Sequence, residues 1–410
     1  MLVGVDVTSI ARVGAVVERT PRFATRVYTE QERRVCAGKP QRWASRWAAK
    51  EAVRKLYSSG GMPMPAYRDI EVMRGRGGPP RVAVRGEVTP IALSLTHDAG
   101  VAIAVAVDAA PQAPRLLMPA SLRLAERPED GHKGTFGRVV VIAGARGYTG
   151  APRLAAYGAA RAGAGLVTVC VPESIYPIVA AACLEVMPAA VDDAGSGALH
   201  PAGLNALRER MRTADAVVIG PGLGRAPETE RVVIDVLQNV PCPAVVDADA
   251  LNIAAATGFD WRRTPQPVVV TPHPAEMARL AGIETAVVQQ DRRGLAVAYA
   301  RERGVTIVLK GSETVIASPR GDVHVDAHRV VALASGGTGD VLAGVIAAML
   351  AQGLEAFEAA VAGVTVHAEA GAMVQEQRGR AGALASDVIE ALPAAQERLR
   401  RALEWLSGRR

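Results

Sequence analysis

Short apolar runs alternate with alanine-rich segments from His132 to about residue 400, and this alternation constrains the fold more than any other feature. The runs are rich in valine and isoleucine, which is typical of strands buried on both faces of a parallel sheet. The alanine-rich segments between them fit crossover helices. We therefore predict an α/β domain over residues 132–400, with a mostly parallel, doubly wound sheet. The predicted strands are Val139–Ala143, Leu166–Val171, Ala216–Ile219, Ala244–Asp247, Val268–Thr271 and Thr306–Lys310.

Residues 1–110 show no such regular alternation. An apolar strand at Leu2–Val7 precedes a long helical segment at about Gln41–Tyr57, so an α+β domain is predicted here. Residues 111–131 hold four prolines and predict a linker with a lead-in to the next domain. Two domains suit a chain of 410 residues. Further strands are predicted near Ile70–Val72, Val82–Val84, Ala92–Leu95 and Val101–Val107.

The positive charge of the chain is concentrated in its first domain. Residues 1–110 carry 17 Lys/Arg and 10 Asp/Glu, whereas the remainder carries 30 and 31. The partner of the first domain is therefore expected to be anionic: a nucleic acid, an acidic protein or a polyphosphate. The sequence contains no RNP-type aromatic motif, zinc finger or arginine-rich tail, so nucleic acid is the weakest of these three.

Two further features bear on the compartment of the protein. No apolar run is long enough to span a bilayer, and no basic leader precedes the first apolar run. The four cysteines are scattered and form no CxxC pair, which fits free thiols in a reducing compartment. We expect a cytoplasmic protein that does not bind a membrane.

A first group of chemical side chains lies in the first domain. Asp6 interrupts the apolar run GVDV, and a charge there is costly unless it is paired or binds a metal. Glu51 and Lys55 lie four residues apart on one face of the predicted helix. Two carboxylates can hold Mg²⁺, and a lysine can neutralise a phosphate leaving group. A surface ion pair on the helix and a strand-end aspartate would explain the same pattern.

Five segments in order support the catalytic interpretation: GVDVTSIARV, RFATRVYTEQE, RWAAKEAVRKL, RDIEVMRGRGGPPRVAVRG and LSLTHDAGVAIAVAV. Together they resemble the holo-(acyl-carrier-protein) synthases over residues 1–108. The resemblance implies transfer of 4′-phosphopantetheine from coenzyme A to a serine of an acyl carrier protein, whose acidity fits the positive charge. It implies Mg²⁺ held by Asp6 and Glu51, with Glu51 and Lys55 in catalysis. Coenzyme A contacts are then assigned to Lys50, Arg54, Lys55 and His97, a hydrogen-bonding or core role for His97 staying open.

The chain departs from this family in one loop. The family often has a Gly-Thr-Gly-like turn after the helix, whereas this chain has Tyr57-Ser58-Ser59-Gly60-Gly61. This difference puts full transferase activity in question. The family typically assembles as trimers, so a homo-oligomer is expected.

The second chemical group is the run Ala334-Ser335-Gly336-Gly337-Thr338-Gly339-Asp340 before an apolar helix. Glycines at a helix start expose backbone N–H groups and form an anion site. Asp340 lies where a base beside a bound phosphate is needed. A helix N-cap after a glycine turn is the structural alternative.

The run belongs to an ordered set of motifs: HKGTFG, YTGAP, RAGAGLVTV, GPGLG, DADALN, TPHPAE, LKG and SGGTGD. The set resembles the ADP/ATP-dependent NAD(P)H-hydrate dehydratases, which have the ribokinase-like fold. The resemblance implies phosphorylation of the hydrated nicotinamide by a nucleotide, then loss of phosphate. Asp340 would be the base. The anion hole is implied to be formed by Gly337, Thr338 and Gly339. Contacts to NAD(P)H hydrate are implied for Ala151, Gly222, Gly224, His273 and Asp340. Contacts to ADP or ATP are implied for Lys310, Gly311, Ser312, Glu313, Thr314 and Gly339.

Alternatives remain for each domain. The second domain would serve equally well as a kinase of a small alcohol such as a vitamin precursor, because Asp340 suits that chemistry too. The first domain would serve as a degenerate module that binds an acidic carrier without modifying it. A basic nucleic-acid adaptor is a third hypothesis, which predicts steep salt dependence of binding.

Overall fold

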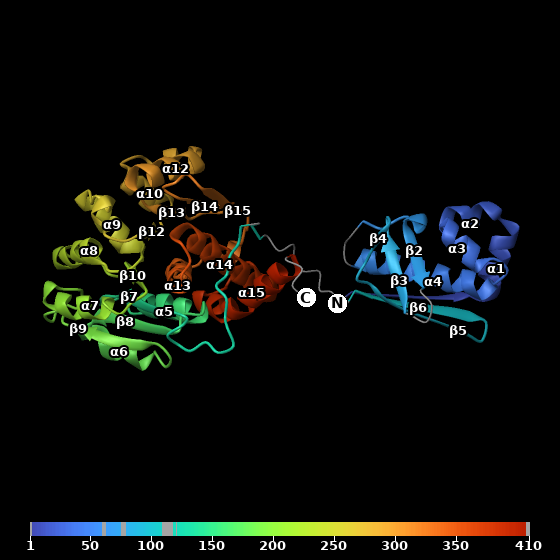
Figure 1. The fold of residues 1–410 in the computed structure, drawn as a ribbon, viewed down its shortest axis with the longest axis horizontal. Coiled ribbons are helices and arrows are strands. Elements are labelled where there is room, and N and C mark those ends of the chain that lie inside the picture. Colours follow the sequence, from blue (N-terminus) through green and yellow to red (C-terminus); the bar gives the residue numbers. More distant parts are fainter. Residues whose placement is uncertain (1, 60–62, 75–78, 109–117, 120, 407–410) are drawn as a thin grey trace. The chain divides into compact units, whose positions relative to one another are not determined.

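The computed structural model describes residues 2–59, 63–74, 79–108, 118–119 and 121–406 (Figure 1). The chain falls into two compact units, Met1–Leu116 and Leu117–Arg410. Gly60 and Gly61 of the post-helix loop and residues 109–117 around the start of the predicted linker lie outside the described residues. Within the described ranges, no helix is both long enough and apolar enough to cross a membrane.

The first unit packs one long helix against a three-stranded antiparallel sheet of order β1-β6-β5. Strand β1 approaches the helix so closely that a Cβ at Gly4 would lie 1.9 Å from the carbonyl oxygen of Ala52. Only glycine fits there, and the same face of the strand carries Asp6 two residues later. These elements are β1 (Leu2–Ser9), α4 (Pro40–Ser59), β5 (Ala92–Asp98) and β6 (Val101–Asp108).

Three short helices and a second sheet complete the first unit. The sequence analysis did not predict these helices, although α3 starts with a capping box in which Thr29 and Glu32 satisfy each other's backbone N–H groups. They are α1 (Ile10–Arg19), α2 (Pro21–Val27) and α3 (Glu30–Cys36). The 3₁₀ turn η1 (Tyr67–Asp69) leads into an antiparallel sheet formed by β2 (Ile70–Arg74), β3 (Pro80–Val84) and β4 (Glu87–Val88).

The second unit is built on a nine-stranded sheet of order β15-β14-β13-β12-β11-β10-β7-β8-β9. All pairings from β13 to β9 are parallel, so the predicted mostly parallel sheet is confirmed. Strands β14 and β15 join antiparallel at one edge and, like β9, were not predicted. The strands are β7 (Arg138–Ile142), β8 (Leu166–Pro172), β9 (Met187–Val191), β10 (Ala216–Ile219), β11 (Ala244–Val246), β12 (Val268–Val270), β13 (Thr306–Leu309), β14 (Thr314–Ala317) and β15 (Val323–Asp326).

Helices cover both faces of this sheet (Figure 1). Helices α7 to α12 share one apolar core with the inward residues of the strands. On the other face α5 packs on β7 and β8, α13 on β7, β10 and β11, and α14 on β12 to β15. The helices are α5 (Gly150–Arg161), α6 (Tyr176–Ala181), α7 (Leu204–Met211), α8 (Pro227–Asn239), α9 (Ala248–Thr257), α10 (Pro274–Ala281), α11 (Thr285–Gln290), α12 (Arg292–Arg303), α13 (Thr338–Ala351), α14 (Ala356–Arg378) and α15 (Ala385–Leu406). Short 3₁₀ turns are η2 (Glu173–Ile175), η3 (Pro201–Gly203), η4 (Trp261–Arg263) and η5 (Val331–Leu333).

The strand order of this sheet locates the region where a ligand is expected. The chain runs outward from β7 to β9 and then continues on the other side of β7 with β10, so the order reverses between β7 and β10. Ligands of open α/β sheets bind beyond the carboxyl ends of the strands near such a reversal.

Candidate active sites

In the first unit, the structure brings Asp6 and Lys55 together. The Lys55 ammonium lies 2.8 Å from a carboxylate oxygen of Asp6 and also donates to the Val5 carbonyl oxygen at 3.0 Å. Glu51, one turn earlier on α4, accepts a hydrogen bond from the hydroxyl of Tyr67. The Asp6 side chain is 14% exposed and the Lys55 side chain 53% exposed, so a ligand can reach the pair.

The two carboxylates of this group fit magnesium by their chemistry. Asp6 and Glu51 offer hard oxygen atoms from adjoining elements, and Mg²⁺ in proteins commonly takes one or two carboxylates plus water and substrate phosphate oxygens. In the described part of the chain, no group of three or more His, Cys, Asp or Glu side chains is placed to hold a metal. A magnesium ion here would therefore depend on oxygen atoms from water and substrate.

The structure corrects the assignment of Lys50 to coenzyme A. Its side chain is fully buried, pairs with Glu32 at 2.7 Å and donates to the backbone oxygens of Tyr67 and Ile70. Burial lowers the pKa of the Lys50 ammonium, opposed by the charge of Glu32. Lys50 therefore holds α4 to α3 and to the start of β2, and it cannot reach a coenzyme A phosphate.

The remaining two residues predicted to contact coenzyme A lie in different surroundings. The Arg54 guanidinium stacks on the ring of Tyr67 at 4.0 Å, next to Glu51. His97 lines a cavity of about 670 Å³ together with Arg42 and Arg46, whereas Asp6, Glu51 and Lys55 do not line it. The structure thus does not bring His97 into one cavity with the carboxylates predicted to bind magnesium.

In the second unit, charged side chains gather at the carboxyl ends of three neighbouring parallel strands. Asp247 follows β11, His273 follows β12 and Lys310 follows β13. The Lys310 ammonium lies 2.7 Å from Asp247 and 4.0 Å from Glu276. Burial by itself lowers the pKa of Lys310, but the charges of Asp247 and Glu276 outweigh it and raise the pKa. Lys310 is therefore a permanent cation at this edge.

Helix α13 presents its N-terminus to the same place. Gly337 precedes the helix in the left-handed region at φ 86°, and a Cβ there would lie 2.4 Å from the Leu154 side chain. The Thr338 hydroxyl donates to the carbonyl oxygens of Leu333 at 2.7 Å and Ser335 at 2.9 Å, which fixes the turn. Among the first N–H groups of α13, that of Thr338 donates to the Ser335 carbonyl oxygen at 3.4 Å, whereas those of Gly339 and Asp340 have no partner within the helix and can meet an anion.

Asp340 in the first turn of α13 has the electrostatics of a base. Burial raises its pKa to about 7, with a further increase from the negative charge of Asp247. Asp249 and Glu276 add to the increase, while Lys310 opposes it. A carboxylate with this pKa can take up a proton near neutral pH, as general-base catalysis requires.

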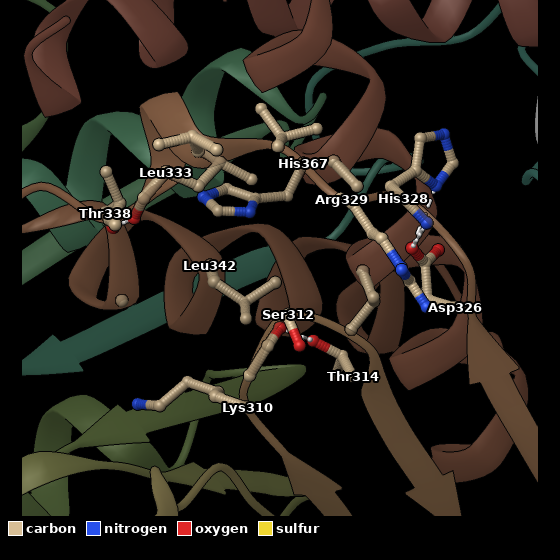
Figure 2. Close-up of a pocket in the computed structure, with 17 residues that line it drawn as sticks. Lys310, Ser312, Thr314, Asp326, His328, Arg329, Leu333, Thr338, Leu342 and His367 are labelled. Carbon is tan, nitrogen blue, oxygen red and sulfur yellow. Dashed lines mark hydrogen bonds and ion pairs between the residues drawn. The ribbon is translucent and has the colours of Figure 1, made fainter. Parts of the chain in front are cut away.

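A cavity of about 450 Å³ adjoins this group (Figure 2). Its polar end is formed by Lys310, Thr338 and Gly339. The same cavity is lined by Gly311, Ser312 and Thr314 of the predicted nucleotide site. Its apolar wall consists of Val330, Val331, Leu333, Leu342, Val364 and Ala368. An apolar pocket that ends at an anion site has the composition of a site for a phosphorylated organic ligand.

Comparison with known proteins agrees with this geometry. Residues 139–394 match the family model of the NAD(P)H-hydrate dehydratases. The chain belongs to this family. A relative, the ADP-dependent (S)-NAD(P)H-hydrate dehydratase of Neisseria meningitidis serogroup B, is 38% identical over 270 residues, which are 65% of this chain and 86% of that protein. Residues 2–106 match the family model of the 4′-phosphopantetheinyl transferase superfamily.

Two further similar proteins concern the second unit. The bifunctional NAD(P)H-hydrate repair enzyme Nnr of Moorella thermoacetica is 43% identical over 281 residues, which cover 68% of this chain and 53% of that protein. The chain thus spans about half the length of the Nnr relatives that it matches. The ADP/ATP-dependent NAD(P)H-hydrate dehydratase from Bacillus subtilis, co-crystallised with ATP and Mg²⁺, is similar with a TM-score of 0.59 and 31% identity. The similarity covers 67% of this chain and 94% of that one. This similarity supports the predicted ribokinase-like fold.

Three of the residues predicted to contact the hydrate lie at the start of α5 and in the loop after β10: Ala151, Gly222 and Gly224. A Cβ at Gly222 would lie 3.0 Å from the Cβ of Ala151, so the loop after β10 and the start of α5 adjoin. The backbone N–H of Gly224 donates to Asp249 at 2.9 Å, which links the same loop to α9. The charge of Asp249 also raises the pKa of Asp340. Asp249 therefore links the loop after β10 to the predicted base.

His273 is both a helix cap and an exposed ring. Its Nδ1 accepts hydrogen bonds from the backbone N–H groups of Ala275 and Glu276 at the start of α10. Burial and the charge of Lys310 lower its pKa, so the ring is neutral with its proton on Nε2. The side chain is 48% exposed, and its Nε2 lies 3.3 Å from a carboxylate oxygen of Glu276.

Glu313 is the member of the predicted nucleotide set that does not line the cavity. Its carboxylate pairs with Arg329, and its backbone carbonyl accepts from Arg292 at 3.0 Å. The charge and hydrogen bond of Arg329 lower the pKa of the exposed Glu313 carboxyl. Glu313 thus pairs with Arg329, which lines the cavity, but does not line the cavity itself.

Sequence reasoning missed four polar residues of the cavity: Asp326, His328, Arg329 and His367. Asp326 and His328 lie at its far end from Lys310, and His367 of α14 lies toward Leu333 (Figure 2). Burial lowers the pKa of His367 to about 4, so this ring is neutral. No motif marks these residues. The only signal was an apolar helix around His367 with a polar side chain at its centre.

Proposed function

We propose that the second unit dehydrates NAD(P)H hydrate to NAD(P)H at the expense of ADP or ATP. The observation that carries the proposal is the position of Asp340, a carboxylate with a pKa of about 7 at the start of α13, which follows the cavity residue Gly339 and is acted on by the charge of the partly buried Lys310. Family membership and the name of the Neisseria relative support the substrate and the donor.

In the proposed mechanism, Asp340 takes the proton of the hydrate hydroxyl, and the hydroxyl oxygen attacks the terminal phosphorus of the nucleotide. AMP leaves from ADP, or ADP from ATP. Lys310 and the N–H groups of Gly337, Thr338 and Gly339 stabilise the charge that develops on the phosphoryl oxygens. Loss of phosphate and of a ring proton then restores the reduced nicotinamide.

The test uses the full chain with hydrated NADH, Mg²⁺ and either ADP or ATP, and follows the absorbance of NADH. We expect recovery of NADH that requires a nucleotide, and a loss of at least about a hundredfold in Asp340→Asn. The matched control is Glu209→Gln, which changes an exposed carboxylate of α7 in the same way. A phosphorylated small alcohol instead of NADH would identify the unit as a kinase and refute the dehydratase.

For the first unit, we propose transfer of 4′-phosphopantetheine from coenzyme A to an acyl carrier protein. The match of residues 2–106 and the contact of Lys55 with Asp6 support it. Magnesium held by Asp6 and Glu51 would neutralise the pyrophosphate of coenzyme A. Lys55, which is half exposed, is placed to meet a phosphate oxygen when Asp6 engages the metal.

The transferase test incubates the full chain with coenzyme A, Mg²⁺ and an acidic apo acyl carrier protein. Mass spectrometry of the carrier reports the gain of one phosphopantetheine. We expect Asp6→Ala to abolish the gain and Glu18→Gln, an exposed carboxylate of α1, to retain it. Binding of the carrier by the parent protein without any mass gain would favour the degenerate binding module.

We also propose that the protein acts as a homo-oligomer in the cytoplasm. The face of β1 opposite α4 leaves Val3, Val5 and Val7 between 43% and 56% exposed, an apolar surface that suits a contact between copies. The free thiols fit a reducing compartment. Light scattering tests the assembly, and Val5→Glu is expected to reduce the measured mass.

A further inference from the structure

A buried carboxylate lies behind the phosphate end of the cavity. Asp247 is 1% exposed, and one of its oxygens lies 2.7 Å from the Lys310 ammonium. The same oxygen accepts a hydrogen bond from the Thr271 hydroxyl at 2.7 Å. The carboxylate is thus fixed from two neighbouring strands, because Asp247 follows β11 and Thr271 follows β12.

The pair of Asp247 and Lys310 lies directly against the anion hole. A Cβ added at Gly339 would lie 3.4 Å from the Lys310 ammonium and 4.0 Å from the second oxygen of Asp247. Gly339 is the residue before Asp340. A side chain at position 339 would therefore separate the ion pair from the helix start.

Four charged groups face Asp340 from the elements around it. Asp247 follows β11, Asp249 lies on α9, Glu276 on α10 and Lys310 after β13. Three of them are negative and one is positive. Among the side-chain charges, Asp247 has the largest effect on Asp340, larger than that of Lys310.

We propose that Asp247 is a positioning residue that holds Lys310 against the anion hole and keeps Asp340 able to accept a proton at neutral pH. The inference rests on the proposed dehydratase reaction and goes beyond it by assigning two tasks to a residue that does not line the cavity. The oxygen shared with Thr271 fixes Lys310 where the transferring phosphoryl group arrives, and the negative charge of Asp247 disfavours ionisation of Asp340.

A purely structural role for Asp247 is the competing explanation. An aspartate that only joins β11 to β12 would, on replacement, lower the rate by the same factor at every pH. A residue that acts through Asp340 would instead move the acid limb of the pH–rate profile, since this limb reports the protonation of the base. The profile therefore separates the two roles.

The experiment measures the rate of NADH recovery by the full chain from pH 5 to 9 at saturating nucleotide. Asp247→Asn removes a negative charge that acts on Asp340 and retains the positive charge of Lys310. The carboxyl group of Asp340 should therefore ionise at lower pH. We expect the acid limb to move to lower pH by about one unit. Thr271→Val retains the charge of Asp247 and is expected to leave the limb in place.

Because Asp247→Asn leaves the partly buried Lys310 without its nearest carboxylate, the variant can prove too unstable to assay. The double variant Asp247→Asn/Lys310→Met removes both members of the ion pair, while the buried Glu276 keeps its hydrogen bond from the His273 N–H. Its residual rate is expected to show the limb at lower pH than the parent, by less than in the single variant, because Asp247 outweighs Lys310 at Asp340.

The proposal is overturned if the acid limb stays in place or moves to higher pH in the folded single variant. Where the single variant fails to fold, the same result in the double variant overturns it. Failure of the dehydratase function itself is seen separately, because the unaltered protein would then recover no NADH. In that case the same profiles are measured on nucleotide-dependent phosphorylation of an alcohol, where Asp340 and Asp247 keep their places.

Discussion

The buried ion group at the far end of the cavity makes the stability of the second unit depend on pH. The His328 ring is 5% exposed, with Nδ1 2.8 Å from Asp326 and Nε2 3.8 Å from Glu369. Glu369 also pairs with Arg398 of α15 at 2.9 Å. Burial alone lowers the pKa of His328, but the hydrogen bond with Asp326 and the charges of Asp326 and Glu369 outweigh it and raise the pKa to about 9.

The size of the effect follows from the two pKa values of His328. The usual value is 6.5, so the folded state binds the proton more tightly by about 2.5 pH units. At about 1.4 kcal/mol per unit, the protonated ring contributes about 3 kcal/mol. Because the folded pKa is the higher one, this contribution is complete below pH 6.5 and is lost as the pH rises to 9.

The assay measures the free energy of unfolding of the second unit by hydrogen exchange of α14 peptides between pH 6 and 9.5, without nucleotide. The matched variant is Asp326→Asn/His328→Gln, which neutralises both partners together. A single His328→Gln would leave two buried carboxylates, which would bind a proton themselves and imitate the slope. We expect the parent to lose about 3 kcal/mol across this range and the double variant less than about 1 kcal/mol.

A parent protein whose unfolding free energy does not change between pH 6.5 and 9 would refute this reasoning. An equal slope in the double variant would refute it as well, because the pH dependence would then arise from other groups.

Two further predictions concern packing. Lys50→Met should destabilise the first unit by about 3–5 kcal/mol, because the buried Glu32 loses its partner. Hydrogen exchange of α4 should show partial recovery in Lys50→Met/Glu32→Gln, whereas a higher KM for coenzyme A without loss of stability would mean that Lys50 binds ligand. Gly344→Ala should destabilise the second unit by about 1–3 kcal/mol, because the added Cβ would lie 2.0 Å from the carbonyl oxygen of Ala155. In thermal unfolding, Gly150→Ala is the control in open space, and equal losses in the two variants would contradict the reasoning.

The local pattern of the sequence was sufficient for strands β7, β8 and β10 to β13 of the second unit. Each central parallel strand is an apolar run such as Val268–Thr271, because a strand covered on both faces must be apolar along its length. Strands β14 and β15 were missed because they pair antiparallel at one side of the sheet and carry polar residues such as Thr314 and His324. The motif SGGTGD could be found in the sequence because the backbone requires glycine at Gly337, where φ is positive and a Cβ would meet the Leu154 side chain.

Which lysine of α4 is buried and which is exposed was decided by tertiary structure. Lys50 and Lys55 lie on one helix in similar sequence, yet Lys50 meets Glu32 of α3 and Lys55 meets Asp6 of β1. The pKa of Asp340 likewise depends on Asp247, which is distant in the chain and reaches it only because parallel strands end at one edge. The sequence by itself determined the apolar central strands and the glycine turn before α13, because these follow from neighbouring residues. Burial and charge come from residues far apart in the chain, so only the folded structure could assign them.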